Sequence, residues 1–205
     1  MLKLLKRGIQ CCWFYFWGHL FSLFYNRKYI TGRWFTGKMH GLSALGWRWV
    51  TCDALNRLKD GLNYSAAYPV GAGCRIVCPE NIVFDPDDLN NFHSFGNYYQ
   101  AIGTIEIGKG TYIAPNVGLI TANHDLTNPD LHLPPRPVIL GKQCWIGMNS
   151  VILPGVTLGD HTVVGAGSVV TKSFEEGFCV IAGNPAKLIR RLPNNDLENK
   201  GDKKE

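Results

Sequence analysis

Aliphatic residues return at every sixth position over the stretch 138–171. Six anchors follow this spacing: Leu140, Ile146, Ile152, Leu158, Val164 and Val170. The residue two places before each anchor is small or β-branched. A six-residue period fits neither a helix nor a lone strand, but a short strand followed by a corner produces it, and this repeat is typical of a parallel β-helix. Because side chains alternate along a strand, each anchor and the residue two before it should point into the coil.

Four anchors are followed by glycine, and we expect these glycines to serve the corners through their conformational freedom. They are Gly141, Gly147, Gly159 and Gly165. Two earlier runs keep the spacing: Ile107, Ile113 and Leu119, and a weaker one at Val70, Ile76 and Ile82. The interval from Leu119 to Leu140 is 21 residues, which is not a multiple of six. The polar segment between them contains four prolines and predicts an inserted loop without regular structure.

The residues before the repeat predict helices. A basic start followed by about seventeen mostly apolar, aromatic-rich residues, up to Tyr25, indicates a first helix. No small-residue cleavage site follows, which argues against a signal peptide. Three readings stay open for this helix: it lies in a membrane interface, it packs on the outside or end of the assembly, or it spans a membrane.

A second helix is predicted over 42–59, as a cap on the first coil. Its apolar residues recur at three- and four-residue steps: Leu42, Leu45, Trp49, Cys52, Leu55 and Leu58. We therefore expect three parts: a helical segment 1–62, a β-helix 63–186 with an inserted loop 125–137, and a basic C-terminal segment 187–205 ending in a disordered tail.

Composition and charge narrow the function. The chain of 205 residues has a formal net charge of +5, and no recognised nucleic-acid motif accompanies its basic termini. The seven cysteines include no Cys-x-x-Cys pair, which favours free thiols in a reducing compartment over a disulfide framework. The sequence offers no set of ligands at zinc-binding spacing, so we expect no metal requirement.

Two segments resemble the hexapeptide-repeat acyltransferases, in the branch that holds galactoside, maltose, xenobiotic and polysaccharide O-acetyltransferases. They are IGKGTYIAPNVGLITANHD and CWIGMNSVILPGVTLGDHTVVGAGSVVTKSFEEGFCVIAGNPAKLIRRL. The resemblance covers roughly residues 97–192. It implies a mainly β fold, a left-handed parallel β-helix, assembled as a homotrimer, and it supplies the hand, because the repeat period does not.

His124 is the candidate general base. Acyl transfer from a thioester to a hydroxyl needs a group that removes the hydroxyl proton near neutral pH, and histidine is the natural choice. His124 stands where the coil breaks into the insert and falls on the catalytic histidine of the resembled family. That family also places an amide side chain opposite the histidine. Counting back without gaps reaches Ser94, so Asn97 and Gln100 are the candidate substitutes, while His132 is a candidate for contact with the acceptor.

The resemblance also implies a site for coenzyme A. Trp145 corresponds to a tryptophan that borders the active-site tunnel, and Met148 stands where related enzymes often have serine. The pantetheine arm and the phosphates would meet these candidate positions: Ala166, Thr171, Lys172, Lys187, Arg190 and Arg191. Positive charge near three phosphates is expected on electrostatic grounds.

These observations favour an acetyl-CoA-dependent O-acetyltransferase that transfers the acetyl group directly to a hydroxyl of a sugar or polysaccharide precursor. The acceptor is a small molecule or a lipid-linked sugar, and the location is cytoplasmic, with a peripheral membrane contact left open. Two alternatives remain at this point: an acetyltransferase for serine or an antibiotic, and a non-catalytic β-helix scaffold.

Overall fold

The computed structural model describes residues 2–36 and 44–193. Two α-helices precede the strands: α1 (Leu2–Phe21) and α2 (Leu45–Asp60). Short 3-10 helices lie at Ser22–Phe24, Arg27–Tyr29, Pro79–Asn81 and Pro86–Phe92. The strands of the first coils are β1 (Arg75–Val77), β2 (Ile82–Phe84), β3 (Tyr98–Gln100), β4 (Ile105–Ile107), β5 (Tyr112–Ile113) and β6 (Gly118–Ile120). The later strands are β7 (Val138–Leu140), β8 (Trp145–Ile146), β9 (Val151–Ile152), β10 (Thr157–Leu158), β11 (Thr162–Val164), β12 (Val169–Val170), β13 (Cys179–Gly183) and β14 (Ala186–Arg191).

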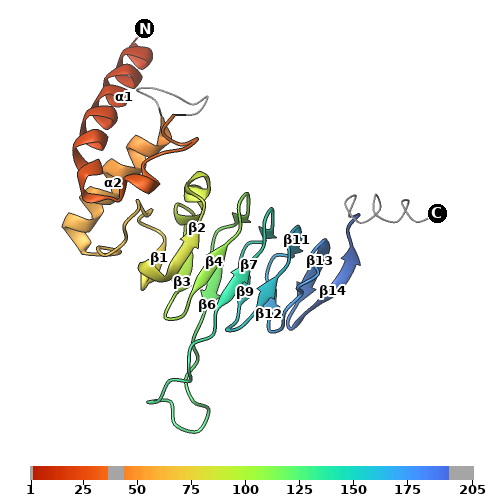
Figure 1. Ribbon diagram of the computed structural model, residues 1–205. Helices are drawn as coiled ribbons and strands as arrows, with labels where there is room; N and C mark the ends of the chain where they lie inside the picture. The colour runs from red at the N-terminus through yellow and green to blue at the C-terminus, as the bar shows by residue number, and fades with distance from the viewer. Residues whose placement is uncertain (1, 37–43, 194–205) are drawn as a thin grey trace.

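The strands form the three walls of a coil that advances along one axis (Figure 1). The first wall has the order β1-β3-β6-β9-β12, the second β10-β7-β4-β2, and the third β14-β13-β11-β8-β5. Neighbouring strands within each wall are parallel, and the one antiparallel pair within these walls joins β13 to β14. The predicted parallel β-helix is therefore confirmed.

The six-residue repeat correctly predicts which residues form the interior of the coil. All six anchors from Leu140 to Val170 are at most 1% exposed, and so are the six residues two places before them. Three of these inner positions are polar: Ser150, Thr162 and Ser168. The hydroxyls of Ser150 and Ser168 donate to the carbonyl of Gly165, and that of Thr162 donates to the carbonyl of Gly159. A buried hydroxyl is tolerated because it keeps a hydrogen-bond partner.

The glycines after the anchors have a different reason from the one expected. Gly141, Gly147 and Gly159 do not adopt a positive φ. A Cβ on Gly141 would lie 2.6 Å from the backbone nitrogen of Asp160, and one on Gly147 would lie 2.6 Å from the carbonyl oxygen of Val164. Glycine is needed here because the backbone of the next coil passes too close for any side chain.

The left-handed backbone positions lie two residues further along. They are Gly110, Asn116, Gln143, Asn149, Gly155, His161 and Gly167. Each stands three places after an anchor, so the turn repeats with the coil. Glycine and asparagine tolerate a positive φ best, and they fill five of these seven positions.

The C-terminal segment begins as part of the fold. β14 pairs with β13 across a hairpin, so residues 187–191 extend the third wall. The predicted basic segment is thus a strand at the end of the coil. The disorder expected for the tail concerns residues 194–205, which lie outside the described residues.

Helices α1 and α2 pack against each other at the N-terminal end of the coil (Figure 1). A Cβ on Gly18 of α1 would lie 2.8 Å from the carbonyl oxygen of Trp47, so the two helices approach closely at this glycine. The ring of Trp47 stacks on His19, with centroids 3.7 Å apart. Among the described helices, none combines the length and the apolar character that crossing a membrane requires.

The second helix exists as predicted, but only the first part of its expected inner face is covered. Leu45 and Trp49 are half-buried, and Trp49 packs against the core. Cys52, Leu55 and Leu58 face outward, and the Leu55 and Leu58 side chains are 44% and 77% exposed. The buried residues of α2 are Gly46, Val50, Thr51, Asp53 and Ala54. Small residues and a buried ion pair face the core here, which the apolar stripe could not indicate. Leu42 lies outside the described residues.

Arg57 ties α2 to the chain that enters the coil. Its guanidinium lies 2.8 Å from the carboxylate of buried Asp53 and donates to the carbonyls of Tyr64, Ala66 and Tyr68. The hydroxyl of Tyr25 donates to the same carboxylate at 2.8 Å. Burial raises the pKa of Asp53, although the Arg57 charge acts in the opposite direction.

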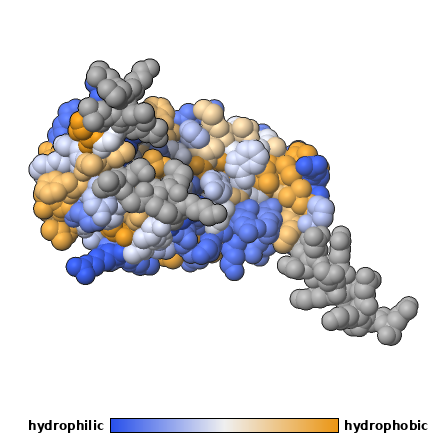
Figure 2. All heavy atoms as spheres, turned by 90° about the horizontal axis from the view of Figure 1, so that it is seen from above, coloured by the Kyte–Doolittle hydropathy of each residue, from blue (hydrophilic) through white to orange (hydrophobic). Residues whose placement is uncertain are grey.

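The outer surface of the helical end is markedly apolar. Figure 2 shows orange surface gathered at this end of the molecule, between hydrophilic side chains in blue. Several large apolar residues there are at least 44% exposed: Ile9, Trp13, Phe16, Leu20, Leu23, Phe24, Leu55 and Leu58.

Candidate active site

The inserted segment leaves the coil after β6 and returns at β7, projecting from the body of the molecule (Figure 1). It contains no helix or strand, as predicted, but it folds back on itself. The backbone of Asp125 donates to Leu131 at 2.8 Å, and that of Leu133 donates to Asn123 at 2.8 Å. These bonds form a short hairpin in which His124 pairs with His132.

The hairpin fixes the orientation of His124. Its Nδ1 lies 2.6 Å from the carbonyl oxygen of Pro129. A carbonyl only accepts hydrogen bonds, so Nδ1 carries the proton and Nε2 is the basic nitrogen of the neutral ring. The side chain is exposed, so Nε2 is accessible to an incoming hydroxyl.

Two neighbours of His124 in the hairpin, His132 and Asp125, make different contacts. The ring of His132 lies beside it, with centroids 4.2 Å apart and planes at 41°. The carboxylate of Asp125 accepts from the backbone of Thr127 and Asn128 and from the Thr127 hydroxyl, which lowers its pKa. Asp125 therefore stabilises the turn of the hairpin.

The two candidate amides differ in position. Gln100 ends β3 beside the root of the insert, and its Oε1 accepts from the backbone of Ala122 at 3.0 Å. The Thr121 hydroxyl donates to the Gln100 carbonyl at 2.6 Å. Gln100 thus holds the strand end from which His124 departs.

Asn97 lies inside the coil and is 1% exposed. Its amide donates to the Tyr99 hydroxyl at 2.8 Å and accepts from the Val117 backbone at 3.0 Å. The expectation that Asn97 faces the acceptor is not met, because its polar atoms already serve the interior. Ser94, at the gapless position, donates to the Ile113 carbonyl at 3.3 Å.

Most of the candidate cofactor residues lie at another corner and wall. Trp145 and Met148 are 58% and 45% exposed. The Gly167 backbone donates to the Met148 carbonyl at 2.8 Å, so the stretch 147–148 lies directly against 165–167, which includes Ala166. This corner joins the third wall to the first.

A row of side chains links Trp145 to the C-terminal strand. In the register of the third wall, Trp145 pairs with Val163, Val163 with Val180, and Val180 with Arg190. Residues at paired positions share a face of the sheet, so Trp145 and Arg190 lie on the same outer face. Lys187 lies on the same strand, opposite Ala182.

Thr171 and Lys172 lie instead on the side of His124. Both follow β12, and the corner after β12 stacks two coils beyond the corner from which the insert departs. Lys172 and Arg191 border a hollow of about 420 Å³ together with Glu175 and Glu176. Arg191 is paired with Glu176, so this hollow carries charges of both signs.

The arrangement separates the predicted site residues into two groups within one chain. His124, Gln100, Thr171 and Lys172 lie at the corner between the first and second walls. Trp145, Met148, Ala166, Lys187 and Arg190 lie on the third wall or at its corner with the first. The first wall stands between the two groups.

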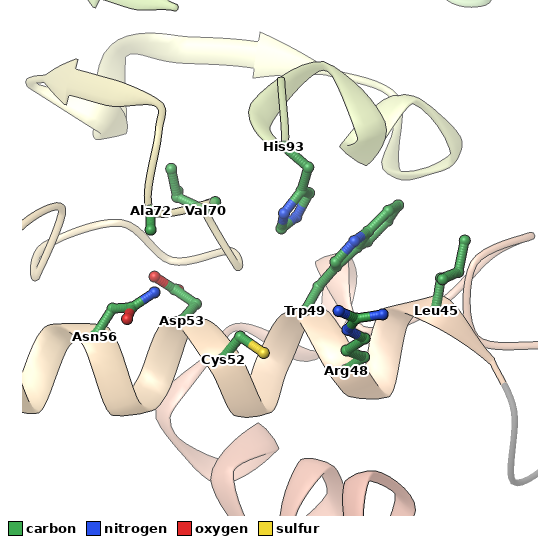
Figure 3. Close-up of a pocket in the computed structure, with 10 residues that line it drawn as sticks. Leu45, Arg48, Trp49, Cys52, Asp53, Asn56, Val70, Ala72 and His93 are labelled. Atoms are coloured by element: carbon green, nitrogen blue, oxygen red, sulfur yellow. The ribbon is translucent and has the colours of Figure 1, made fainter. Parts of the chain in front are cut away.

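A second cavity, of about 260 Å³, lies between α2 and the first coil (Figure 3). The imidazole of His93 stacks on Trp49 there, with centroids 4.1 Å apart and planes at 12°. Its Nε2 is buried and has no hydrogen-bond partner among the described residues. Desolvation lowers the pKa of His93 to about 3, so the ring is neutral.

The buried cysteines are poor candidates for a nucleophile. All seven cysteines are free, and burial raises the pKa of Cys74 to about 12 and that of Cys144 to about 11. Such thiols are poor nucleophiles because little thiolate forms. In the described ranges, no cluster of three or more His, Cys, Asp or Glu side chains is placed to hold a metal ion.

Comparison with known proteins decides the family. The family model for bacterial transferase hexapeptide repeats (six repeats) matches residues 137–172. The putative lipopolysaccharide biosynthesis O-acetyl transferase WbbJ of Escherichia coli K12 is 33% identical over 150 residues, which cover 65% of this chain and 74% of that protein. The chain belongs to the hexapeptide-repeat acyltransferase family. Its coil is therefore the left-handed parallel β-helix of that family.

Other members of the hexapeptide-repeat family share only part of their length with the chain. The galactoside O-acetyltransferase of E. coli K12 is 36% identical over 119 residues, covering 52% of this chain and 57% of that protein. The crystal structure of a maltose O-acetyltransferase from Clostridium difficile 630 superposes with a TM-score of 0.51 at 32% identity, covering 61% and 66% of the two chains. The chain thus spans little more than half of some relatives.

Sequence reasoning missed what orients His124. The Pro129 carbonyl is a backbone group, so no side-chain motif in the sequence indicates its position. The sequence also gave no indication of the hairpin within the insert, because the prolines and polar residues of this segment do not follow the two-residue alternation of a strand.

Proposed function

We propose that the protein is an acetyl-CoA-dependent O-acetyltransferase that acts on a hydroxyl of a sugar or polysaccharide precursor. Family membership supports acyl transfer, and the names of the galactoside, maltose and lipopolysaccharide relatives support a sugar acceptor. The observation that carries the proposal is the geometry of His124. Its Nδ1 is held by the Pro129 carbonyl, and its exposed ring leaves Nε2 as the base.

The proposed reaction is a direct transfer. Nε2 of His124 takes the proton of the acceptor hydroxyl as its oxygen attacks the thioester carbonyl carbon. The tetrahedral intermediate then collapses, the carbon–sulfur bond breaks, and the imidazolium returns a proton to the leaving thiolate. Backbone N–H groups are suited to stabilise the oxyanion. This sequence of steps needs neither a covalent acyl-enzyme nor a metal.

We place the complete site between subunits of a homotrimer. One chain separates the corner of His124 from the corner of Met148 and Ala166 by a whole wall of the coil. In a ring of identical subunits each copy presents one surface to one neighbour and a different surface to the other. The His124 corner of one copy would then meet the cofactor corner of the next. We include in this proposal a contact of the N-terminal segment with the membrane, where a lipid-linked acceptor would lie.

Replacing the base tests the chemistry. We expect His124→Ala to lower kcat by about 100- to 10,000-fold, the usual contribution of a general base. Coenzyme A binding should persist, because most of the candidate cofactor residues, among them Trp145, Met148 and Ala166, lie at another corner or wall. His132→Ala is the matched control, since it removes the other imidazole of the hairpin and should cost far less.

The measurement is turnover of a verified sugar acceptor, with thermal shift by coenzyme A as the binding readout. Near-normal turnover by His124→Ala would refute the base assignment. No thermal shift with the unmodified protein would favour the non-catalytic scaffold instead.

Subunit complementation tests the shared site. His124→Ala removes the base, and Ala166→Trp should block the cofactor corner, so each variant alone should be inactive. In a mixed trimer one junction joins an intact His124 corner to an intact Ala166 corner. Coexpression should therefore restore about a third of the activity per trimer. A mixture that stays inactive, with mixed trimers demonstrated by mass, would place the whole site within one chain.

A further inference from the structure

Helix α1 is apolar on both of its faces. The inner face packs on α2 through Phe14, Gly18 and Phe21. The outer face repeats at three- and four-residue steps and is 45% to 65% exposed: Ile9, Trp13, Phe16 and Leu20. A helix that is hydrophobic all round normally has both faces covered, yet only one is covered here.

The exposed patch continues beyond α1. Leu23 and Phe24 follow it directly and are each 74% exposed. Phe24, Leu58 and Tyr64 border a cavity of about 300 Å³ where the end of α1 meets α2. A contiguous apolar surface of this kind marks an interaction site more often than a free surface.

The charge of this region indicates what kind of partner the apolar surface binds. The first 52 residues contain eight Lys and Arg and no Asp or Glu, although the chain has 21 basic and 16 acidic residues in all. Lys6, Arg27, Lys28 and Arg48 are exposed among the described residues. Figure 2 shows blue side chains beside the apolar surface at this end.

We infer that the outer face of α1 docks on an anionic lipid bilayer, with its apolar side chains in the interface and the basic side chains on the head groups. Tryptophan and phenylalanine suit this depth, and lysine and arginine are attracted to anionic lipids. Face-to-face pairing with a second copy would bring two basic surfaces together, which charge repulsion opposes. The inference deepens the proposed function, on which it rests for its purpose: docking brings the site close to lipid-linked acceptors.

Vesicle binding tests this inference on the full-length protein. Sedimentation with vesicles of phosphatidylcholine and phosphatidylglycerol is compared with vesicles of phosphatidylcholine alone. We expect binding to the mixed vesicles to be at least about tenfold tighter and to weaken as salt rises. Phe16→Glu should weaken it by at least about tenfold, because it removes apolar contact and adds a repelled charge.

Val83→Glu is the matched control, since Val83 is 57% exposed on β2, a strand of the coil, and not on the outer face of α1. It should bind vesicles like the unmodified protein. Equal binding by Phe16→Glu and the unmodified protein, or no binding by either, would overturn the inference. So would a Phe16→Glu variant that changes the oligomeric mass while vesicle binding persists, because the face would then be a subunit contact.

The same variants separate this inference from the proposed function. Phe16→Glu should keep its turnover of a soluble acceptor, because the face lies on α1 and not on the coil. Vesicle binding without any coenzyme A binding would refute the enzyme and leave the docking face intact. Normal acetyl transfer without vesicle binding would do the reverse.

Discussion

We predict that the buried imidazole of His93 makes the folded protein less stable in mild acid. The ring stacks on Trp49, and its Nε2 is buried without a hydrogen-bond partner among the described residues, which favours the neutral ring. Its pKa is about 3 in the folded protein against 6.5 ordinarily. In acid the unfolded chain therefore binds a proton that the folded protein does not. Stability is fully present above pH 6.5 and falls as the pH drops from there toward 3.

The size of the effect follows from the shift. One pKa unit corresponds to about 1.36 kcal/mol, so lowering the pH from 7.5 to 5 should remove about 2 kcal/mol. Carrying the titration to pH 3 should remove roughly 4 kcal/mol. Asp53 and Asp88 act in the opposite direction, because burial raises the pKa of each carboxyl. The comparison must therefore be made between the unmodified protein and His93 variants.

The assay is urea unfolding followed by tryptophan fluorescence at pH 7.5 and pH 5, at one fixed protein concentration. The His93 ring also makes a hydrogen bond to the backbone of Pro69. His93→Phe keeps an aromatic ring against Trp49, and His93→Asn keeps a small donor for that backbone group. Neither side chain titrates, so both variants should lose about 2 kcal/mol less than the unmodified protein between the two pH values. A variant that loses as much as the unmodified protein would show that His93 is not the source.

Two further predictions concern the packing of the coil and its cap. In urea unfolding, Gly141→Ala should lower the free energy of unfolding by about 2 kcal/mol, because its Cβ would lie 2.6 Å from the backbone of Asp160. Gly118→Ala is the control: the nearest contact of its Cβ is 3.5 Å, so it should change the free energy of unfolding by less than about 0.5 kcal/mol. Arg57→Met should cost about 3 to 5 kcal/mol in the same assay, since it leaves the Asp53 carboxylate buried without its cation; a loss below about 1 kcal/mol would contradict this.

The interior of the coil was predictable from the sequence because one physical rule produces it. Every coil must bury the same inward positions, so the anchors recur at a fixed interval and the register is readable along the chain. Ile107, Ile113 and Leu119 belong to the same core, as do the weaker Ile76 and Ile82. The glycine positions were readable as well, but their reason was not, because close approach between coils involves backbone atoms far apart in sequence.

The helical cap was only half predictable. Its hydrophobic spacing indicates a second helix correctly, but only part of the side that faces the core, namely Leu45 and Trp49. Val50 and Ala54 bury one side together with the charged pair of Asp53 and Arg57, while Leu58 is left outside. A pattern of apolar residues identifies the inner face only when no other face is apolar. At this end of the molecule the first helix and the second both carry surplus apolar surface.

The insert marks the limit of inference from periodicity. A sequence repeat identifies the positions that recur in every coil, and these positions are the buried ones. Under the proposed function, residues that would select an acceptor lie in the inserted hairpin, which departs from the repeat and in which Leu126, Leu131 and Leu133 are 97%, 57% and 42% exposed. Their exposure beside His124 provides apolar surface that a neighbouring subunit or an acceptor would cover. We therefore propose that this hairpin, rather than the coil, determines which acceptor is taken.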